Sequence, residues 1–457
     1  MSTNKKSRKS GMKDLTVGNP SKVILLYALP LLGSFLVQQL YSTVDLIFAG
    51  RFIGKQASSA IGSSDLLVTC IIGLFTGISV GSNVVAAQFY GAGDRKSLKQ
   101  LIQTVYSFGL VGATALFAMG QLLAPTFLHW LHTPEDVYPL SLSYLRIYFI
   151  SIFAIILYNL GSGIVRALGD SRAAFRFQII GGAVNIVTDF IFIYFFHWGV
   201  AGAAAATALS QILSASLALR YLMKLDEDIA LKLREFLIKG KLLTRVLAIG
   251  IPSGIQSMII TFSNLFIQSI INSFGVNTMA AFAAYFKLEL FMYYPCIAYG
   301  QALVTYTAQN VGAGKEDRVK RGLRTTLLLA IVSVGCISLV CFILGRPMFS
   351  LFSSDQDVIA EGLRIIRVTY PLYFIYSVQE CFGSVCKGRG YARMPMVIIV
   401  FCMCICRVIA INITTSINWA IESIAVVYPI TWALSGILMV VYYIWLNRKP
   451  GRRSAAN

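Results

Sequence analysis

Apolar runs of about 20 residues recur along the whole chain, and no other feature limits its fold so strongly. Hydrophobic residues make up 56% of the 457 positions and charged residues only 13%, whereas soluble domains carry about 25% charged residues. A helix of about 20 apolar residues crosses the hydrocarbon core of a bilayer with every backbone group satisfied internally. The sequence therefore predicts an all-α integral membrane protein rather than a soluble helical one.

The runs predict twelve membrane-spanning helices, whose ends the pattern fixes only to within several residues. They are expected over residues 21–52, 58–90, 97–128, 140–165, 172–196, 199–223, 244–273, 278–310, 318–345, 358–386, 394–415 and 420–446.

Lys and Arg outnumber Asp and Glu by 39 to 20, which gives a net charge of +19. The basic residues gather in the terminal segments and in every second connection between the expected helices. This alternation is the positive-inside pattern, so we expect a multi-pass protein of the cell (plasma) membrane with both termini in the cytoplasm. Because topology accounts for most of the charge, we expect the lipid bilayer, and no nucleic acid, as a partner.

The two halves of the sequence repeat. Gln88-Phe-Tyr-Gly-Ala-Gly93 matches Gln309-Asn-Val-Gly-Ala-Gly314 at an offset of 221 residues, and Pro30 matches Pro252 at 222. A duplicated unit with six helices, an even number, predicts two lobes related by a pseudo-two-fold axis along the membrane normal. The expected parts are an N-terminal tail (1–21), an N-lobe (22–223), a basic cytoplasmic connector (224–243), a C-lobe (244–446) and a C-terminal tail (447–457).

Asp45 lies inside the first apolar run, where a carboxylate costs about 2.5–3.5 kcal/mol at a bilayer centre and marks a functional site by default. Asn185 and Asp189 share one face of the fifth helix because they are four residues apart. Asp45 precedes the outer helix end by about 9 Å and Asp189 by about 12 Å. The two carboxylates can therefore lie at one depth, in the outer half of the membrane.

Asn159 in the fourth helix and Thr207 in the sixth are candidates to complete this group, although the depth of Asn159 fits less well. Two carboxylates, two amides and a hydroxyl offer oxygen ligands for a hard cation such as Na+, and the carboxylates can also exchange a proton. The structural alternative is that each side chain bonds a neighbouring helix.

The second half has no such group, since Phe266 and Ala410 stand opposite Asp45 and Asp189. It carries other charges within its apolar runs. Glu289 and Glu380 are candidates to meet a cationic substrate, and Lys287 needs a partner across the cavity. These three residues are the substrate-binding candidates. Pro30 removes a backbone hydrogen bond from the first helix and kinks it, either statically or as a bend that depends on the charge of Asp45.

Taken in order, these motifs resemble the multidrug and toxic compound extrusion (MATE) transporters, and more closely their bacterial DNA-damage-inducible-F-like branch. The resemblance covers residues 15–446. It rests on the repeated Gln-x-x-Gly-Ala-Gly turn, on Asp45 before Ala49-Gly50, on Asn185-x-x-x-Asp189 and on the small-residue run 199–207.

The resemblance implies secondary active efflux of organic, often cationic and amphipathic compounds, driven by inward flow of Na+ or H+. It implies two lobes that alternate between outward-open and inward-open states. A cation site in the N-lobe would be built from the residues that match the motif, and Pro30 matches a proline associated with helix bending. The matching residues are Asp45, Asn159, Asn185, Asp189 and Thr207.

The resemblance leaves one alternative in the same superfamily, a lipid-linked saccharide flippase, which commonly has two more C-terminal helices and an Arg-rich cavity. An enzyme is not expected, because His-Glu-x-x-His is absent from the sequence and the three histidines, at 129, 132 and 197, all lie toward outer helix ends. We expect no cofactor, small organic substrates and a monomer. The same oxygens serve Na+ and H+, so both coupling ions stay open.

Overall fold

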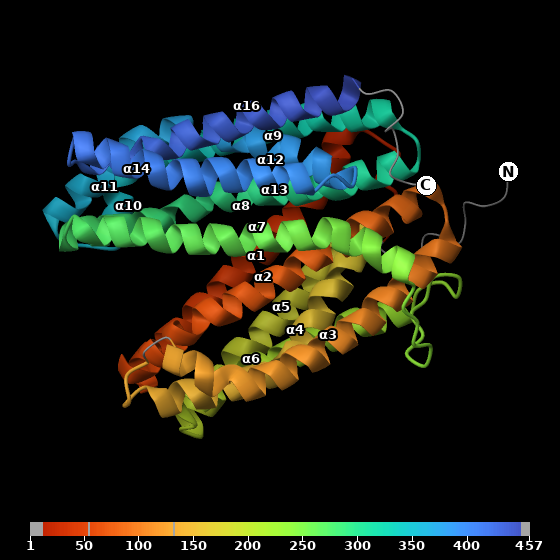
Figure 1. Ribbon diagram of the computed structural model, residues 1–457, viewed down its shortest axis with the longest axis horizontal. Coiled ribbons are helices and arrows are strands. Elements are labelled where there is room, and N and C mark those ends of the chain that lie inside the picture. The colour runs from red at the N-terminus through yellow and green to blue at the C-terminus, as the bar shows by residue number, and fades with distance from the viewer. Residues whose placement is uncertain (1–11, 54, 131–132, 449–457) are drawn as a thin grey trace. The chain divides into compact units, whose positions relative to one another are not determined.

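The computed structural model describes residues 12–53, 55–130 and 133–448, and almost all of them are helical (Figure 1). The expected tails, 1–21 and 447–457, fall largely outside this part of the chain. The first part forms α1 (Pro20–Phe48), α2 (Lys55–Ala92), α3 (Arg95–Trp130), α4 (Tyr138–Ala167), α5 (Ser171–Asp189), α6 (Gly199–Met223) and α7 (Gly240–Ser273), with π-helical turns η2 (Ala49–Ile53) and η3 (Phe190–Phe195).

The second part is more often interrupted. It forms α8 (Val276–Gly312), α9 (Glu316–Ile343), α10 (Gly345–Ser350), α11 (Gln356–Thr369), η4 (Tyr370–Leu372), α12 (Phe374–Gly388), α13 (Arg393–Ile399), η5 (Val400–Cys406), α14 (Arg407–Ile417), α15 (Ile421–Ala425) and α16 (Val427–Arg448). The helix expected over 358–386 is broken at η4, where Pro371 cannot donate a backbone hydrogen bond.

Ten helical segments in the described part of the chain are long and apolar enough to cross a membrane. Two further segments complete the expected set of twelve. One is α8, which is 37 residues long and carries Lys287 and Glu289, and the other is the broken pair α11 and α12. The all-α membrane architecture is therefore confirmed.

The chain folds into two compact units that do not follow chain order. The first comprises Gly33–Gly254 and the segment that ends at Asp14, and the second comprises Leu15–Leu32 and the chain from Ile255 onward. The helices α1 and α7 each pass from one unit into the other. Pro30 and Pro252 lie two residues before these crossing points, so the repeat extends to the place where the chain changes unit.

In the first unit, α4 packs against α2, α3, α5 and α6 (Figure 1). The helices α2 and α7 approach each other most closely at glycines. A Cβ atom on Gly77 would meet the backbone of Gly250 and Gly254, and one on Gly81 would meet the backbone of Val246 and Gly250. Small residues at this crossing bring the two backbones into direct contact, as is common where helices pack in membranes.

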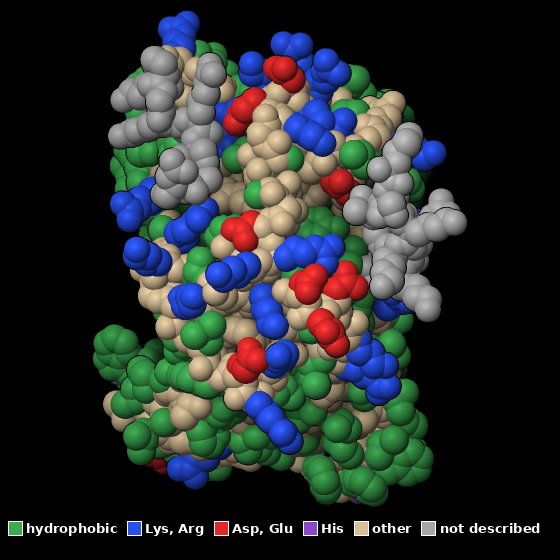
Figure 2. Space-filling view, turned by 90° about the vertical axis from the view of Figure 1, so that its right-hand side faces the viewer, with side chains coloured by type: hydrophobic (Ala, Val, Ile, Leu, Met, Phe, Trp, Pro, Cys, Tyr) green, Lys and Arg blue, Asp and Glu red, His purple; other side chains and the backbone are tan. Residues whose placement is uncertain are grey.

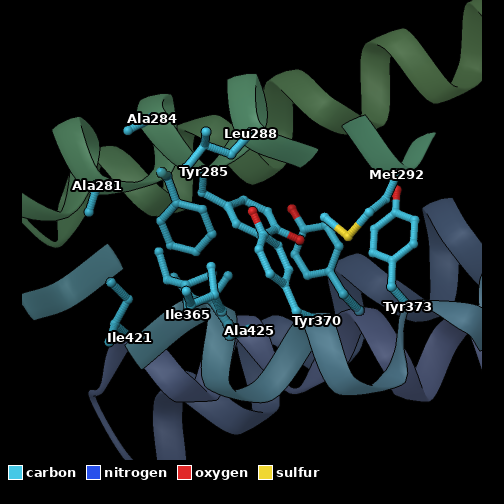
Figure 3. Close-up of a cluster of buried hydrophobic side chains, with 14 of the residues drawn as sticks. Ala281, Ala284, Tyr285, Leu288, Met292, Ile365, Tyr370, Tyr373, Ile421 and Ala425 are labelled. Carbon is cyan, nitrogen blue, oxygen red and sulfur yellow. The ribbon is translucent and has the colours of Figure 1, made fainter. Parts of the chain in front are cut away.

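The core of the second unit is built around aromatic side chains. Tyr285 and Leu288 of α8 face Tyr370 and Tyr373 in Figure 3, and all four are buried. The ring of Tyr373 also packs edge-on against Trp432 of α16, with centroids 4.8 Å apart. These contacts join α8, η4 and α16 in one core.

The turns after α2 and α8 confirm that the two halves repeat at the level of single residues. Gly93 and Gly314 adopt φ angles of +72° and +69°, a left-handed conformation that favours glycine. In each turn, the residue after the glycine donates its backbone N–H to the carbonyl five residues earlier. The Gly-Ala-Gly motif is thus a helix-ending turn in both places.

The segment before α1 is fastened to the second of these turns. The backbone N–H of Leu15 donates to Gln309 Oε1 at 2.9 Å, and Lys315 Nζ donates to both oxygens of Thr16 at 3.0 Å. Arg318 donates to the Leu15 carbonyl, and the Leu15 side chain is buried. The chain is therefore anchored to the second unit before its first helix begins.

Arg389 joins three helix ends in the second unit, and its loss is expected to be costly. Its guanidinium donates to Asn447 Oδ1 at 2.7 Å and to Glu316 Oε2 at 2.8 Å, and it lies over the ring of Tyr443. We expect Arg389→Ala to lower the free energy of unfolding by about 1–3 kcal/mol, because Glu316 is only partly exposed and loses its cation. The melting temperature in detergent measures the loss. The melting temperature of Arg389→Lys should lie between those of the wild-type protein and Arg389→Ala, since one ammonium group cannot make both hydrogen bonds of the planar guanidinium.

Candidate functional site

Asp45 and Asp189 meet in the first unit. Asp45 is half-buried near the end of α1, and Asp189 is the fully buried last residue of α5. Their carboxyl groups lie close enough to interact with each other. A hydrogen bond between them needs a proton on one of the two, because an ionised carboxylate only accepts. The structure thus brings together the two carboxylates that the sequence placed at one depth.

The atoms around this pair lack partners. Asp45 Oδ1, both carboxylate oxygens of Asp189 and both polar side-chain atoms of Asn185 are buried without a hydrogen-bond partner among the described residues. A buried polar atom left unsatisfied costs about 1–3 kcal/mol. Two facing carboxylates also repel each other unless a proton or a cation lies between them. The group therefore fits a small cation or a proton, and its cluster of oxygens suits Na+.

An ion at such a site would be held by the oxygen atoms of two carboxylates and one amide. Within the described ranges, no group of three or more His, Cys, Asp or Glu side chains could hold a metal ion.

Asn159 and Thr207 are half-buried on α4 and α6. Asn159 Nδ2 donates to the carbonyl of Ile155 in its own helix at 2.8 Å, and the Asn159 carbonyl accepts from Ser79 Oγ. None of the hydrogen bonds found in the described part of the chain joins Asn159 or Thr207 to the carboxylate pair. Their part in the site stays a prediction.

Three polar side chains that sequence reasoning missed link α1, α4 and α5. Tyr158 donates to Gln178 Oε1 at 2.6 Å, and Gln178 Nε2 donates to Tyr41 Oη at 3.4 Å. Tyr41 lies one turn before Asp45 in α1. Gln178 lies two turns before Asn185 in α5 and on the same face. That spacing is the signal that could have found them.

Irregular turns follow both carboxylates. The π-helical turn η2 begins four residues after Asp45, and η3 begins directly after Asp189. Their aromatic side chains pack together, with ring centroids 5.6 Å apart for Phe52 and Tyr194 and 6.2 Å apart for Phe48 and Phe190. The carboxylate pair is therefore bordered by aromatic rings on the side toward these helix ends, and π-helical turns are frequent at functional sites.

The substrate-binding candidates of the second unit are Glu289, Glu380 and Lys287, and both glutamates lie near Tyr293 and Tyr376. Glu289 is half-buried and accepts a hydrogen bond from Tyr373 Oη at 3.1 Å. Glu380 is half-buried and accepts from Ser384, whereas Lys287 is exposed. No ion pair found among the described residues joins any of the three.

A buried arginine also belongs to this region. Arg407 is 5% exposed, donates twice to Thr431 Oγ1 and lies over the ring of Tyr428. Its guanidinium thus contacts a hydroxyl and a ring face directly, and the carboxyl of Glu289 lies near enough to interact with its charge.

Comparison with known proteins identifies the family. A family model described as MatE matches the chain twice, over residues 30–191 and 252–412. The second match begins 222 residues after the first, which is the offset of Pro30 and Pro252. The double match agrees with the internal repeat.

Relatives align over nearly the whole chain. "Probable multidrug resistance protein YoeA" of Bacillus subtilis (strain 168) is 26% identical over 98% of this chain and 97% of its own length. "Probable multidrug resistance protein YpnP" of the same organism is 29% identical over 84% of this chain and 86% of its own length.

Solved structures share the fold. The outward-facing structure of a multidrug resistance MATE family transporter of the MOP superfamily matches with a TM-score of 0.89 at 20% identity, over 95% of this chain and 97% of that one. A MOP superfamily transporter from Pyrococcus furiosus matches with a TM-score of 0.88 at 20% identity, over 96% and 98%. Twelve membrane-spanning helices in two six-helix lobes are therefore confirmed. Since the MatE matches cover more than half of its residues, the chain belongs to the MatE family of membrane transporters.

Proposed function

We propose that this protein is a multidrug efflux transporter that exchanges organic, cationic amphipathic compounds for Na+ or H+ by alternating access. The main support is the pair Asp45 and Asp189. Their buried carboxyl oxygens have no hydrogen-bond partner among the described residues, and neither have the side-chain atoms of Asn185. The names of the relatives from Bacillus subtilis support drug export.

The carboxylate pair is the coupling site. A bound Na+ or proton removes the repulsion between the two carboxylates, so the arrangement seen here is stabilised by the ion. Asn185 contributes its amide oxygen, and Asn159 and Thr207 complete the site when α4 and α6 bring them closer. Ion and substrate favour different states of the transporter, so the binding of each promotes release of the other.

Pro30 lets α1 bend in response to the ion. The residue lacks the N–H that would tie this turn to the preceding one, so the helix bends there at low cost. α1 changes unit two residues later, between Leu32 and Gly33. A bend at this point changes the direction of the half-helix that carries Asp45.

The second unit supplies the groups that meet the drug. Glu289 of α8, oriented by the hydroxyl of Tyr373, attracts a cationic nitrogen of the drug. Glu380 of α12 offers a second carboxyl group for the same purpose. Lys287 on the exposed side of α8 repels cations and restricts where they bind. Aromatic rings around Glu289 favour flat organic cations.

The protein is a monomer in the plasma membrane with both termini in the cytoplasm. The support is the alternation of basic connections along the sequence. Lys and Arg side chains also outnumber Asp and Glu on the face in Figure 2.

The coupling ion is identified by driving dye uptake into everted membrane vesicles, which corresponds to export from the cell, with one gradient at a time. A Na+ gradient at equal pH and a pH gradient without Na+ are applied to the wild-type protein and to Asp45→Asn. We expect one gradient to energise the wild-type protein and neither to energise the variant. Transport that is equally fast without any gradient contradicts the proposal.

A further inference from the structure

The connector between α6 and α7, residues 224–239, is fixed along α3 and is visible as the yellow-green loop in Figure 1. Gln103 Nε2 donates to the Lys232 carbonyl at 2.8 Å, and the Lys232 N–H donates back to Gln103 Oε1 at 3.2 Å. The N–H of Leu237 donates to Ser107 Oγ at 3.0 Å. Gln103 and Ser107 are both buried beneath the connector. The position of this segment is therefore set by α3.

The length of α3 shows at what depth the connector lies. Ser107 precedes Trp130, at the other end of α3, by 23 residues, or about 35 Å at 1.5 Å per residue. Trp130 is 78% exposed, and tryptophan concentrates at the membrane–water interface. Since the hydrocarbon core is about 30 Å thick, Ser107 and the bound Leu237 fall in the headgroup layer of the opposite leaflet.

The pattern of buried and exposed side chains along α3 indicates the same depth for the connector. Residues 101–107 are all buried, in part because the connector covers them. The exposed apolar side chains of α3 begin at Leu110 and Val111, which are 43% and 50% exposed. The connector thus ends where the lipid-facing surface of α3 begins.

At this level the connector exposes apolar side chains. Leu233, Phe236 and Ile238 are 59%, 65% and 40% exposed, although the backbone between them is held by α3. Exposed apolar side chains in the headgroup layer are stabilised when they insert toward the acyl chains. We call these three residues the apolar tip.

Basic side chains flank the apolar tip. Lys232 pairs with Glu235 at 3.1 Å and holds the pKa of that carboxyl below its usual value, so these two charges offset each other. Arg234, Lys239 and Lys241 are exposed and take part in none of the ion pairs found over residues 12–53, 55–130 and 133–448. Three uncompensated positive charges lie around an apolar tip in the headgroup layer.

We propose that this connector is a binding site for anionic phospholipid headgroups in the leaflet at the basic end of the protein. The apolar tip inserts below the phosphates, and Arg234, Lys239 and Lys241 bind them. This inference rests on the proposed function only in that the basic end of the protein faces the cytoplasm. A soluble partner would have to displace lipid at this depth, whereas an anionic lipid complements both the charge and the apolar tip.

Insertion of the tip is tested by tryptophan fluorescence in vesicles of phosphatidylethanolamine and phosphatidylglycerol. Lipids brominated near the headgroup end of the acyl chain should quench the tryptophan fluorescence of Phe236→Trp more than that of the wild-type protein. Glu227→Trp, at an exposed connector position before the tip, is the matched control and should add no quenching. Equal quenching at 236 and 227 overturns the insertion of the tip.

Lipid selectivity is tested by native mass spectrometry after purification from the same mixed vesicles. The triple variant Arg234→Gln, Lys239→Gln, Lys241→Gln should lower the ratio of retained phosphatidylglycerol to phosphatidylethanolamine about a hundredfold, since each of the three basic residues is worth roughly a fivefold preference at an anionic surface. The control triple variant Lys320→Gln, Arg321→Gln, Arg324→Gln removes the same charge at the start of α9.

The control should leave the ratio near the wild-type value. An equal fall in both triple variants, or no fall in the connector variant, overturns the proposal. Neither readout involves transport, so the result is independent of whether Asp45 couples an ion.

Discussion

Asp45→Asn is expected to lower ion-driven drug transport severely while the protein still inserts and folds. The carboxyl of Asp45 faces that of Asp189, and an amide can neither take up a proton nor supply the negative charge that holds Na+. Since the coupling between two ligands of a transporter is typically about 1–3 kcal/mol, uphill efflux should fall by about 5–150-fold. Dye uptake into everted vesicles under the effective gradient measures the loss.

The partner residue sharpens this test. Asp189→Asn should cause a loss of similar size, and the double variant should be no worse than either single one, because the two carboxyl groups act as one site. Asp317→Asn is the control, since its side chain is 89% exposed at the start of α9. Efflux at the wild-type rate in Asp45→Asn would rule out the carboxylate pair as the coupling site.

Gly77→Ala is expected to destabilise the first unit strongly, because it overpacks the crossing of α2 and α7. The new Cβ would meet the backbone of Gly254 and Gly250, and a backbone cannot rotate away as a side chain can. Overpacking of this kind costs about 1–3 kcal/mol and sometimes more. The melting temperature in detergent should fall by several degrees, as about 1 kcal/mol shifts it by roughly 2–4 °C in a unit of this size.

The matched control for this prediction is Gly335→Ala in α9. A Cβ at Gly335 meets nothing within 4 Å, and alanine stabilises a helix interior by about 0.5–1 kcal/mol relative to glycine. Gly335→Ala should therefore melt at or slightly above the wild-type temperature. If Gly77→Ala has the same melting temperature as Gly335→Ala, the close contact of α2 and α7 does not contribute to stability.

Hydropathy predicted the helices well because bilayer thickness sets their length. The sixth was expected over 199–223 and is observed as Gly199–Met223. Others extend a few residues beyond their apolar runs, as α3 does from Arg95, because the polar ends continue into the interface where charges are solvated. The π-helical turn η5 left no mark in the sequence, since it changes the hydrogen-bond register without changing the apolar pattern.

The candidate site was partly predictable for the same reason. Asp45 and Asp189 were paired by counting residues from the helix ends, which works because buried charges are rare and their depth is fixed. Tyr41, Gln178 and Tyr158 were not found, since neutral polar side chains carry little hydropathy signal and their contacts join different helices. The orientation of the Asn159 amide toward its own helix was equally invisible to the sequence.

The passage of α1 and α7 between units has a consequence for how the protein is made. The first unit includes the chain up to Gly254, so its packing of α2 against α7 cannot form until the ribosome has passed the midpoint of the message. Conversely, the segment Leu15–Leu32 is among the first to be synthesised, yet Leu15 can form its hydrogen bonds with Gln309 and Arg318 only after those residues have been made. Each unit therefore includes a segment from the other half of the sequence, although the two halves repeat. Biogenesis thus makes the two halves interdependent.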